Sequence, residues 1–150
     1  EERQSRKIAK LIIENRPLSN ADELSDLIKK NIRQTNYKIN PSTKTFQALR
    51  IYINEELNSL SQALEQSLEI LGVGGRMAVI SYHSLEDRIV KNFFKKESKY
   101  CICPPNIPEC DCGHFPKLKI ITKKPVSPSQ SEIDANKRSR SAKLRVVERI

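Results

Sequence analysis

Residues 81–84 bring two hydroxyls, a phenol and an imidazole together, as Ser81, Tyr82, His83 and Ser84. A short apolar run precedes them, and a helical pattern with many charged residues follows. In open α/β sheets ligands bind beyond the carboxyl ends of the strands, and this segment is predicted to occupy that position. Two interpretations stay open. Either Ser84 caps the helix and His83 makes a backbone hydrogen bond, or His83 and the serines meet a substrate.

Four cysteines form a second group with possible chemistry, in the pattern Cys101-Ile-Cys103 and Cys110-Asp-Cys112. Four thiolates in two close pairs have the number and the softness to hold a tetrahedral zinc ion, and His114 could replace one of them. Such a metal would be structural, because four cysteines leave no open coordination position. Reduced thiols on a surface loop are the alternative. Disulfides are disfavoured because the chain has the features of a cytosolic protein.

The positive charge of the chain is concentrated near its C-terminus. The formal net charge is +9, and residues 117–150 hold ten Lys and Arg against three Asp and Glu, a net of +7. The segment KRSRSAKLR within this region alternates cations with serines. Cations of this kind contact phosphates and position a nucleic acid without reading its bases. Arg138, Arg140 and Lys143 are therefore candidate phosphate contacts for RNA or DNA.

Several classes of protein are excluded or disfavoured by absent patterns. The sequence has no G-x-G-x-x-G and no P-loop, so a nucleotide cofactor would have to be held by residues outside this chain. Its longest strongly apolar run is far below the roughly 20 residues that span a bilayer, which predicts a cytosolic protein. The chain begins with Glu1 in what looks like a helix rather than with Met, so we expect it to be part of a longer polypeptide.

The first half of the sequence has the apolar spacing of helices. Residues 1–33 predict a helical hairpin that is interrupted at Pro17, with Asn20 and Glu23 compatible with a capping box. Residues 34–41 are polar and read as a connection, after which Ser42 or Thr43 can cap the next helix. An apolar stripe then runs over residues 46–71. Because this exceeds the usual length of a globular helix, we expect a kink or a change from one core to another along it.

The second half alternates helices with short strands, which predicts the α/β class. Residues 77–81 are apolar and bounded by turn signals, as in a buried parallel strand, and Ser84 with Asp87 can cap the helix that follows. Residues 118–122 and 143–147 are two further candidate strands. Three strands are too few for a complete doubly wound sheet, which agrees with the expectation of a partial chain.

Three long stretches, in this order, resemble the family of bacterial ribosomal RNA small-subunit methyltransferase H. They are STKTFQALRIYINEEL, GGRMAVISYHSLEDRIVKNFF and ITKKPVSPSQSEIDANKRSRSAKLRVVER. The resemblance covers nearly the whole chain but only the C-terminal half of the family. The chain has Lys44, Tyr82 and Lys137 where the family usually has Arg, Phe and Pro, and none of these changes removes a candidate catalytic group.

The resemblance implies a fold and a division into domains. It implies the C-terminal part of a doubly wound, Rossmann-like, S-adenosylmethionine-dependent methyltransferase. Residues 1–45 would be the end of an inserted helical substrate-recognition domain, and residues 46–150 the C-terminal half of the methyltransferase domain. The three candidate strands would then be the fifth, sixth and seventh of the sheet.

The resemblance also implies an activity, the methylation of a cytidine N4 in 16S rRNA of the small ribosomal subunit, with S-adenosylmethionine as donor. On this reading His83 could accept a proton or hydrogen bond from the amine, and Ser81 could orient it. Ser84, Arg138, Arg140 and Lys143 would contact the RNA. The alternative is a non-enzymatic RNA-binding module with a zinc-stabilised loop, which charge and cysteines alone support.

Overall fold

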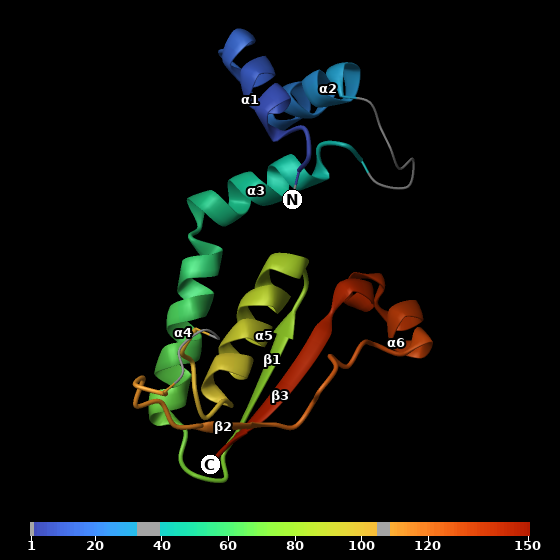
Figure 1. Cartoon of the computed structure of the whole chain (residues 1–150). Helices are drawn as coiled ribbons and strands as arrows, with labels where there is room; N and C mark the ends of the chain where they lie inside the picture. Colours follow the sequence, from blue (N-terminus) through green and yellow to red (C-terminus); the bar gives the residue numbers. More distant parts are fainter. Residues whose placement is uncertain (1, 33–39, 105–108) are drawn as a thin grey trace. The chain divides into compact units, whose positions relative to one another are not determined.

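The structure is a computed structural model that describes residues 2–32, 40–104 and 109–150. They belong to two units, Glu1–Glu56 and Leu57–Ile150 (Figure 1). The division falls within the apolar stripe predicted over residues 46–71. Glu55, with a positive φ of 49°, separates helix α3 (Thr43–Ile53) from helix α4 (Glu56–Ile70). The predicted break in the stripe is confirmed, and each helix contributes to a different core.

The first unit contains the predicted helical hairpin, formed by α1 (Ser5–Glu14) and α2 (Ala21–Asn31). Asn20 caps α2 by accepting a hydrogen bond from the Glu23 N–H at 2.9 Å, as predicted. The Glu23 carboxylate accepts a hydrogen bond from the Ser19 N–H, one residue earlier than in a capping box. The core of this unit consists of Ile8, Leu24, Ile28 and Ile32. The predicted connection over residues 34–41 lies mostly outside the described residues.

The second unit contains a three-stranded sheet, formed by β1 (Arg76–Ser81), β2 (Leu118–Ile120) and β3 (Lys143–Arg149). The predicted strand positions are confirmed. The strand order is β1-β3-β2, and both neighbouring pairs are antiparallel. The prediction of a parallel partner for residues 77–81 is wrong for the described strands, because β3 runs back beside β1.

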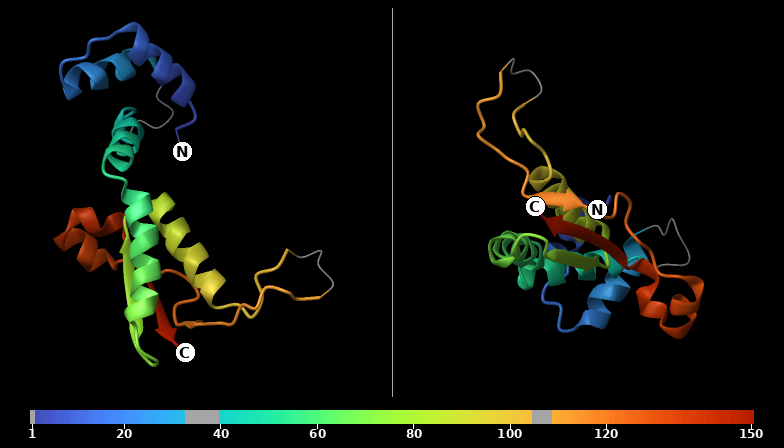
Figure 2. Two further views of the ribbon diagram at one scale, coloured as in Figure 1. Left: turned by 90° about the vertical axis from the view of Figure 1, so that its left-hand side faces the viewer. Right: turned by 90° about the horizontal axis from the view of Figure 1, so that it is seen from below.

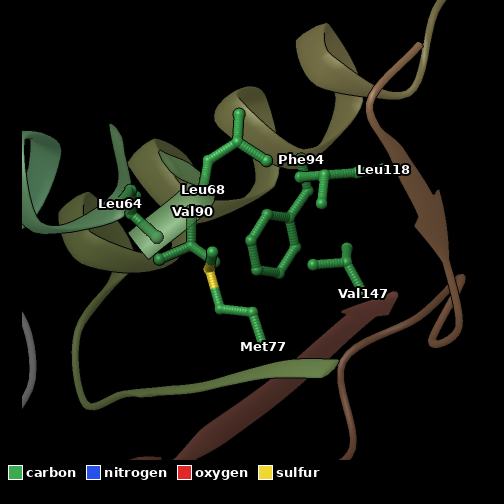
Figure 3. Packing of buried hydrophobic residues seen from close by; sticks show 7 residues of the cluster. All are labelled: Leu64, Leu68, Met77, Val90, Phe94, Leu118 and Val147. Carbon is green, nitrogen blue, oxygen red and sulfur yellow. The ribbon is translucent and has the colours of Figure 1, made fainter. Parts of the chain in front are cut away.

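One face of the sheet is covered by α4 and by α5 (Ser84–Glu97) (Figures 1 and 2). Figure 3 shows the side chains that meet in this core: Leu64, Leu68, Met77, Val90, Phe94, Leu118 and Val147. They come from both helices and all three strands, so burial of apolar surface links every element of the layer pair.

Buried and exposed residues alternate along β1, so only one face of the strand is buried. The continuous apolar run had predicted burial on both faces. Met77 and Ser81 of β1 are buried on the helix side, whereas Ile80 is 57% exposed on the other side. The register pairs Met77 with Val147 and Ser81 with Lys143, so inward positions of β1 lie beside inward positions of β3. This alternation decides which polar side chains of β3 face α5.

A glycine turn leads into β1, and a short helical segment leads into β3. Gly74 has a φ of 81°, and its N–H donates to the Arg149 carbonyl at 2.8 Å, which joins the turn to the end of β3. Between β2 and β3 the chain forms α6 (Gln130–Ala135) and a 3-10 helix, η1 (Lys137–Ser141). Among the described residues no helix is both long and apolar enough to cross a membrane.

Candidate functional site

The antiparallel register gathers two sequence-predicted groups at one end of the sheet. Ser81, the last residue of β1, lies opposite Lys143, the first residue of β3. The chain leaves β1 towards His83 and enters β3 from η1, which carries Arg138 and Arg140. The polar turn and the basic segment, 50 or more residues apart in the sequence, therefore lie at the same edge of the sheet. This edge is the candidate functional site.

His83 is held at the N-terminus of α5 by a reciprocal pair of hydrogen bonds. Its Nδ1 accepts from the Glu86 N–H at 3.3 Å, and the Glu86 carboxylate accepts from the His83 N–H at 3.2 Å. The same carboxylate accepts from the Tyr82 N–H at 2.8 Å. The prediction that Ser84 and Asp87 form the cap is wrong by one residue, because the imidazole supplies the acceptor and Glu86 stands three positions after it.

This cap sets the role of the other ring nitrogen. Since Nδ1 accepts a hydrogen bond, the proton of the neutral imidazole is on Nε2, which is therefore a donor. Nε2 lies 3.3 Å from a Glu86 carboxylate oxygen, but the two atoms do not form a hydrogen bond. No described residue forms a hydrogen bond with Nε2, which is buried within a side chain only 12% exposed. A buried polar atom of this kind is costly without a partner.

The two serines of the segment differ in their surroundings. Ser81 is buried, and its hydroxyl donates to the Lys143 carbonyl at 3.4 Å, which joins the paired ends of β1 and β3. Ser84 is the exposed first residue of α5. Ser81 is therefore placed to fix the strand end that leads to His83, while Ser84 is accessible from solvent.

A buried ion pair behind the edge was missed by the sequence analysis. Asp87 of α5 accepts two hydrogen bonds from the Arg145 guanidinium, at 2.7 and 3.2 Å, and lies 3.5 Å from the Lys143 ammonium. Hydrogen bonding from Arg145, followed by the positive charges of Arg145 and Lys143, outweighs desolvation and holds the Asp87 pKa below its ordinary value. The sequence did contain a sign of this ion pair. Arg145 stands two residues before Val147, so both side chains lie on the inward face of β3.

The three predicted phosphate contacts divide accordingly. Lys143 is half-buried and shares the Asp87 carboxylate with Arg145. Arg138 and Arg140 are exposed on η1, and in the part of the chain that the structure describes neither side chain has an ion-pair partner. Two uncompensated cations thus remain at the edge, where they attract polyanions.

The four cysteines come together in the segment between α5 and β2. Their sulfur atoms all lie within 4.8 Å of one another, and no disulfide joins them. The Sγ–Sγ distances are 3.9 Å for Cys103–Cys110, 3.5 Å for Cys110–Cys112 and 3.9 Å for Cys112–Cys101. His114 is turned to α5 instead, with Nε2 3.1 Å from the Lys96 carbonyl.

The thiols of this cluster differ in acidity. Hydrogen bonds from the backbone of Ile102 and His114 lower the pKa of Cys112 to about 6. A backbone hydrogen bond from Cys103 lowers the pKa of Cys101, but the neighbouring thiols outweigh it and raise this pKa to about 12. Of these two thiols, Cys112 therefore ionises first as the pH rises.

Comparison with known proteins establishes the class. Residues 1–150 match the model of the MraW methylase family, so the chain belongs to that family of methylases. Its resemblance to the methyltransferase family, inferred from three motifs, is confirmed.

The relatives carry one name. Ribosomal RNA small subunit methyltransferase H of Dehalococcoides mccartyi is 55% identical over 150 residues, which are all of this chain and 43% of the relative. The proteins of that name from Caldicellulosiruptor saccharolyticus and Heliobacterium modesticaldum are 52% and 51% identical over 153 and 157 residues, and the alignment covers all of this chain and 50% of each relative. The chain therefore spans about half the length of the curated relatives it matches.

Proposed function

We propose that this chain is part of an enzyme that methylates small-subunit ribosomal RNA, with S-adenosylmethionine as donor and the N4 amine of a 16S rRNA cytidine as acceptor. Family membership and the printed name of the relatives support the class of reaction. The observation that carries the site is the register of β1 with β3, which puts His83 and the cations of η1 at one edge. Ribosomes as substrate place the enzyme in the cytoplasm.

The methyl donor is assigned to residues outside this chain. A glycine-rich turn after a strand is the usual cradle for such a cofactor. Here Gly72, Gly74 and Gly75 precede β1, at the end of the strand opposite to His83, and Gly113 lies in the cysteine segment. The residues that the structure describes therefore do not fit the donor. In this proposal the Rossmann-like half that would bind it is the other part of a doubly wound fold.

His83 acts on the base as a hydrogen-bond donor. A cytosine amine is a poor nucleophile because its lone pair is delocalised into the ring, so it must be held rigidly in line with the donor. The base must also leave its stack or be presented from a loop. Since the cap leaves the ring proton on Nε2, His83 suits the acceptor atoms O2 and N3 of cytosine better than its amine, and the buried Nε2 must become accessible to make this contact. To accept the amine proton, as the sequence analysis suggested, His83 would have to give up its bond to Glu86.

The remaining site residues position the reactants. Ser81 keeps the end of β1 against β3 and so fixes the start of the turn that carries His83. Arg138 and Arg140 contact RNA phosphates, with Ser84 as a hydroxyl accessible at the same edge. Lys143 contributes charge close to this edge while neutralising Asp87.

The experiment uses the full-length protein with methyl-labelled S-adenosylmethionine and small ribosomal subunits lacking the modification. Digestion of the rRNA to nucleosides should give label in N4-methylcytidine, at one nucleotide per subunit. Label in another nucleoside would contradict the acceptor. Absence of label, with cofactor binding intact, would contradict the reaction.

The non-enzymatic RNA-binding module is not favoured. The relatives that match along all 150 residues are named as methyltransferases. The RNA-binding module would be the better account if the full-length protein bound rRNA stoichiometrically but transferred no methyl group. This would have to hold for free rRNA, for assembly intermediates and for complete small subunits.

A further inference from the structure

The segment between α5 and β2 lacks the usual means of holding a fixed conformation. Its described residues, 98–104 and 109–117, contain no helix or strand. Figure 2 shows these residues extending away from the sheet and helices of the second unit. Tyr100 and Phe115 are 80% and 74% exposed, so the segment's aromatic side chains form no core. Irregular segments of this length are uncommon in compact domains unless something else orders them.

Both ends of the segment are anchored by hydrogen bonds. The Lys117 N–H donates to the Glu97 carbonyl at 2.8 Å, and the Lys117 carbonyl accepts from the Ile150 N–H at 3.1 Å. His114 adds a contact to the Lys96 carbonyl. Besides these contacts, the thiols of the four cysteines bring the two arms of the segment together. Cys101 and Cys103 lie on one arm, and Cys110 and Cys112 on the other.

The separation of the sulfurs matches a single tetrahedral ion. With metal–sulfur bonds of about 2.3 Å, four thiolates at tetrahedral corners stand about 3.8 Å apart. Three of the Sγ–Sγ distances in the structure are 3.5, 3.9 and 3.9 Å. A cubane iron–sulfur cluster would hold its four cysteines further apart, since each binds a different iron atom. Disulfides would bring the sulfurs to about 2.05 Å in pairs.

We propose that Cys101, Cys103, Cys110 and Cys112 bind one structural zinc ion that clamps the two arms of this segment together. Four soft thiolates in tetrahedral array select zinc or iron, and zinc is the ion that such closed sites use without redox chemistry. On binding, the cysteines that are still protonated release their protons to solvent, and four thiolates with one Zn²⁺ give the site a net charge of −2. The sequence supplies cations on both flanks of the segment, at Lys95, Lys96, Lys99 and Lys117. His114 is not a ligand, because its ring is directed to α5.

The site is structural and separate from methyl transfer. Four protein ligands leave no position for water or substrate. The proposal therefore stands or falls independently of the reaction at the His83 edge. Loss of the metal is expected to loosen the segment without opening the core, since Leu118, the first residue of β2, stays packed against Phe94 and Val147.

The first test is the metal content of the full-length protein, purified under reducing conditions without chelator and measured by inductively coupled plasma mass spectrometry. We expect about one zinc per chain, and the same value for His114→Gln. Cys110→Ser and Cys112→Ser should each lower it at least fivefold. Iron in place of zinc, retention of zinc by both cysteine variants, or loss of zinc in His114→Gln would overturn the proposed ligand set.

A second measurement keeps the proposal testable if the chain is isolated without metal or if a variant folds poorly. Reduced wild-type chain is titrated with Co²⁺, and the intense visible bands of a tetrahedral cobalt–thiolate site should saturate at one equivalent and disappear on addition of zinc. Amide exchange should slow in residues 98–104 and 109–117 when zinc is bound, while β1 and β3 stay unchanged. Failure to saturate at one equivalent, or identical exchange with and without zinc, would contradict the clamp.

Discussion

The core beneath the sheet and the cysteine segment are stabilised in two different ways. In the core, Phe94 and Val147 are almost fully buried, and the buried carboxylate of Asp87 is neutralised by Arg145. In the cysteine segment, Tyr100 and Phe115 are exposed and the thiols are gathered with no apolar layer around them. Apolar burial stabilises the first region, whereas the second requires a ligand to hold its polar groups.

The comparison predicts a large difference between two phenylalanines. Phe94→Ala removes a ring that is 3% exposed and leaves a cavity, so it should lower the free energy of unfolding by about 3–5 kcal/mol. Phe115→Ala removes a ring that is 74% exposed and should change it by less than about 0.5 kcal/mol. Urea denaturation of the chain followed by circular dichroism measures both. Equal losses would mean that the segment has a core of its own.

Two aspartates extend the comparison to charges. Asp87→Asn leaves Arg145 buried without its counter-charge and should cost about 3 kcal/mol. The matched control is Asp26→Asn, whose partner Lys29 is exposed, and this change should cost less than about 0.5 kcal/mol. The same denaturation experiment applies. If Asp87→Asn is as mild as the control, the ion pair does not link α5 to β3 energetically.

Acid should weaken the same ion pair. Because the pKa of Asp87 is lower in the folded chain than its ordinary value of 3.8, the pair contributes fully above that value. As the pH falls below about 3.8, the unfolded chain binds the proton first, and stability decreases until the folded value is reached. The free energy of unfolding of the wild type should therefore fall more than that of Asp87→Asn between about pH 5 and 2, with both proteins measured at one ionic strength. Parallel curves for the two proteins would argue against the shift.

The smallest effect is expected from the exposed cations of η1. In the full-length protein, Arg138→Ala and Arg140→Ala should each weaken rRNA binding and reduce the slope of log affinity against log salt by about 1. The control is Lys119→Ala, an exposed cation on β2, which lies beside the opposite end of β3. A salt titration of binding gives the slopes. Equal effects at Lys119 would indicate non-specific attraction.

The sequence predicted the elements well and their pairing less well. Apolar spacing gave all three strands and the break between α3 and α4, because burial periodicity is a local property. The antiparallel pairing of β1 with β3 depends on a return of the chain over more than 60 residues, which no local pattern encodes.

The candidate site was predictable to a similar extent. His83 and the basic segment were found by residue type, and their convergence required the register. Asp87 was given the capping role that Glu86 fills, because both stand at capping distance from a polar residue, and only the buried Arg145 decides between them. The assignment of residues 1–45 to an inserted recognition domain stays a prediction.

The most direct measurement is the methyl-transfer rate of full-length His83→Asn with saturating S-adenosylmethionine. Asparagine is a good N-cap, so this variant keeps the start of α5 but loses Nε2, while His83→Ala loses both. We predict that kcat/KM on small ribosomal subunits falls about 10²-fold or more in both variants, that cofactor affinity is unchanged, and that only His83→Ala is destabilised. Near wild-type turnover in His83→Asn would show that His83 only caps the helix and would contradict the proposed site.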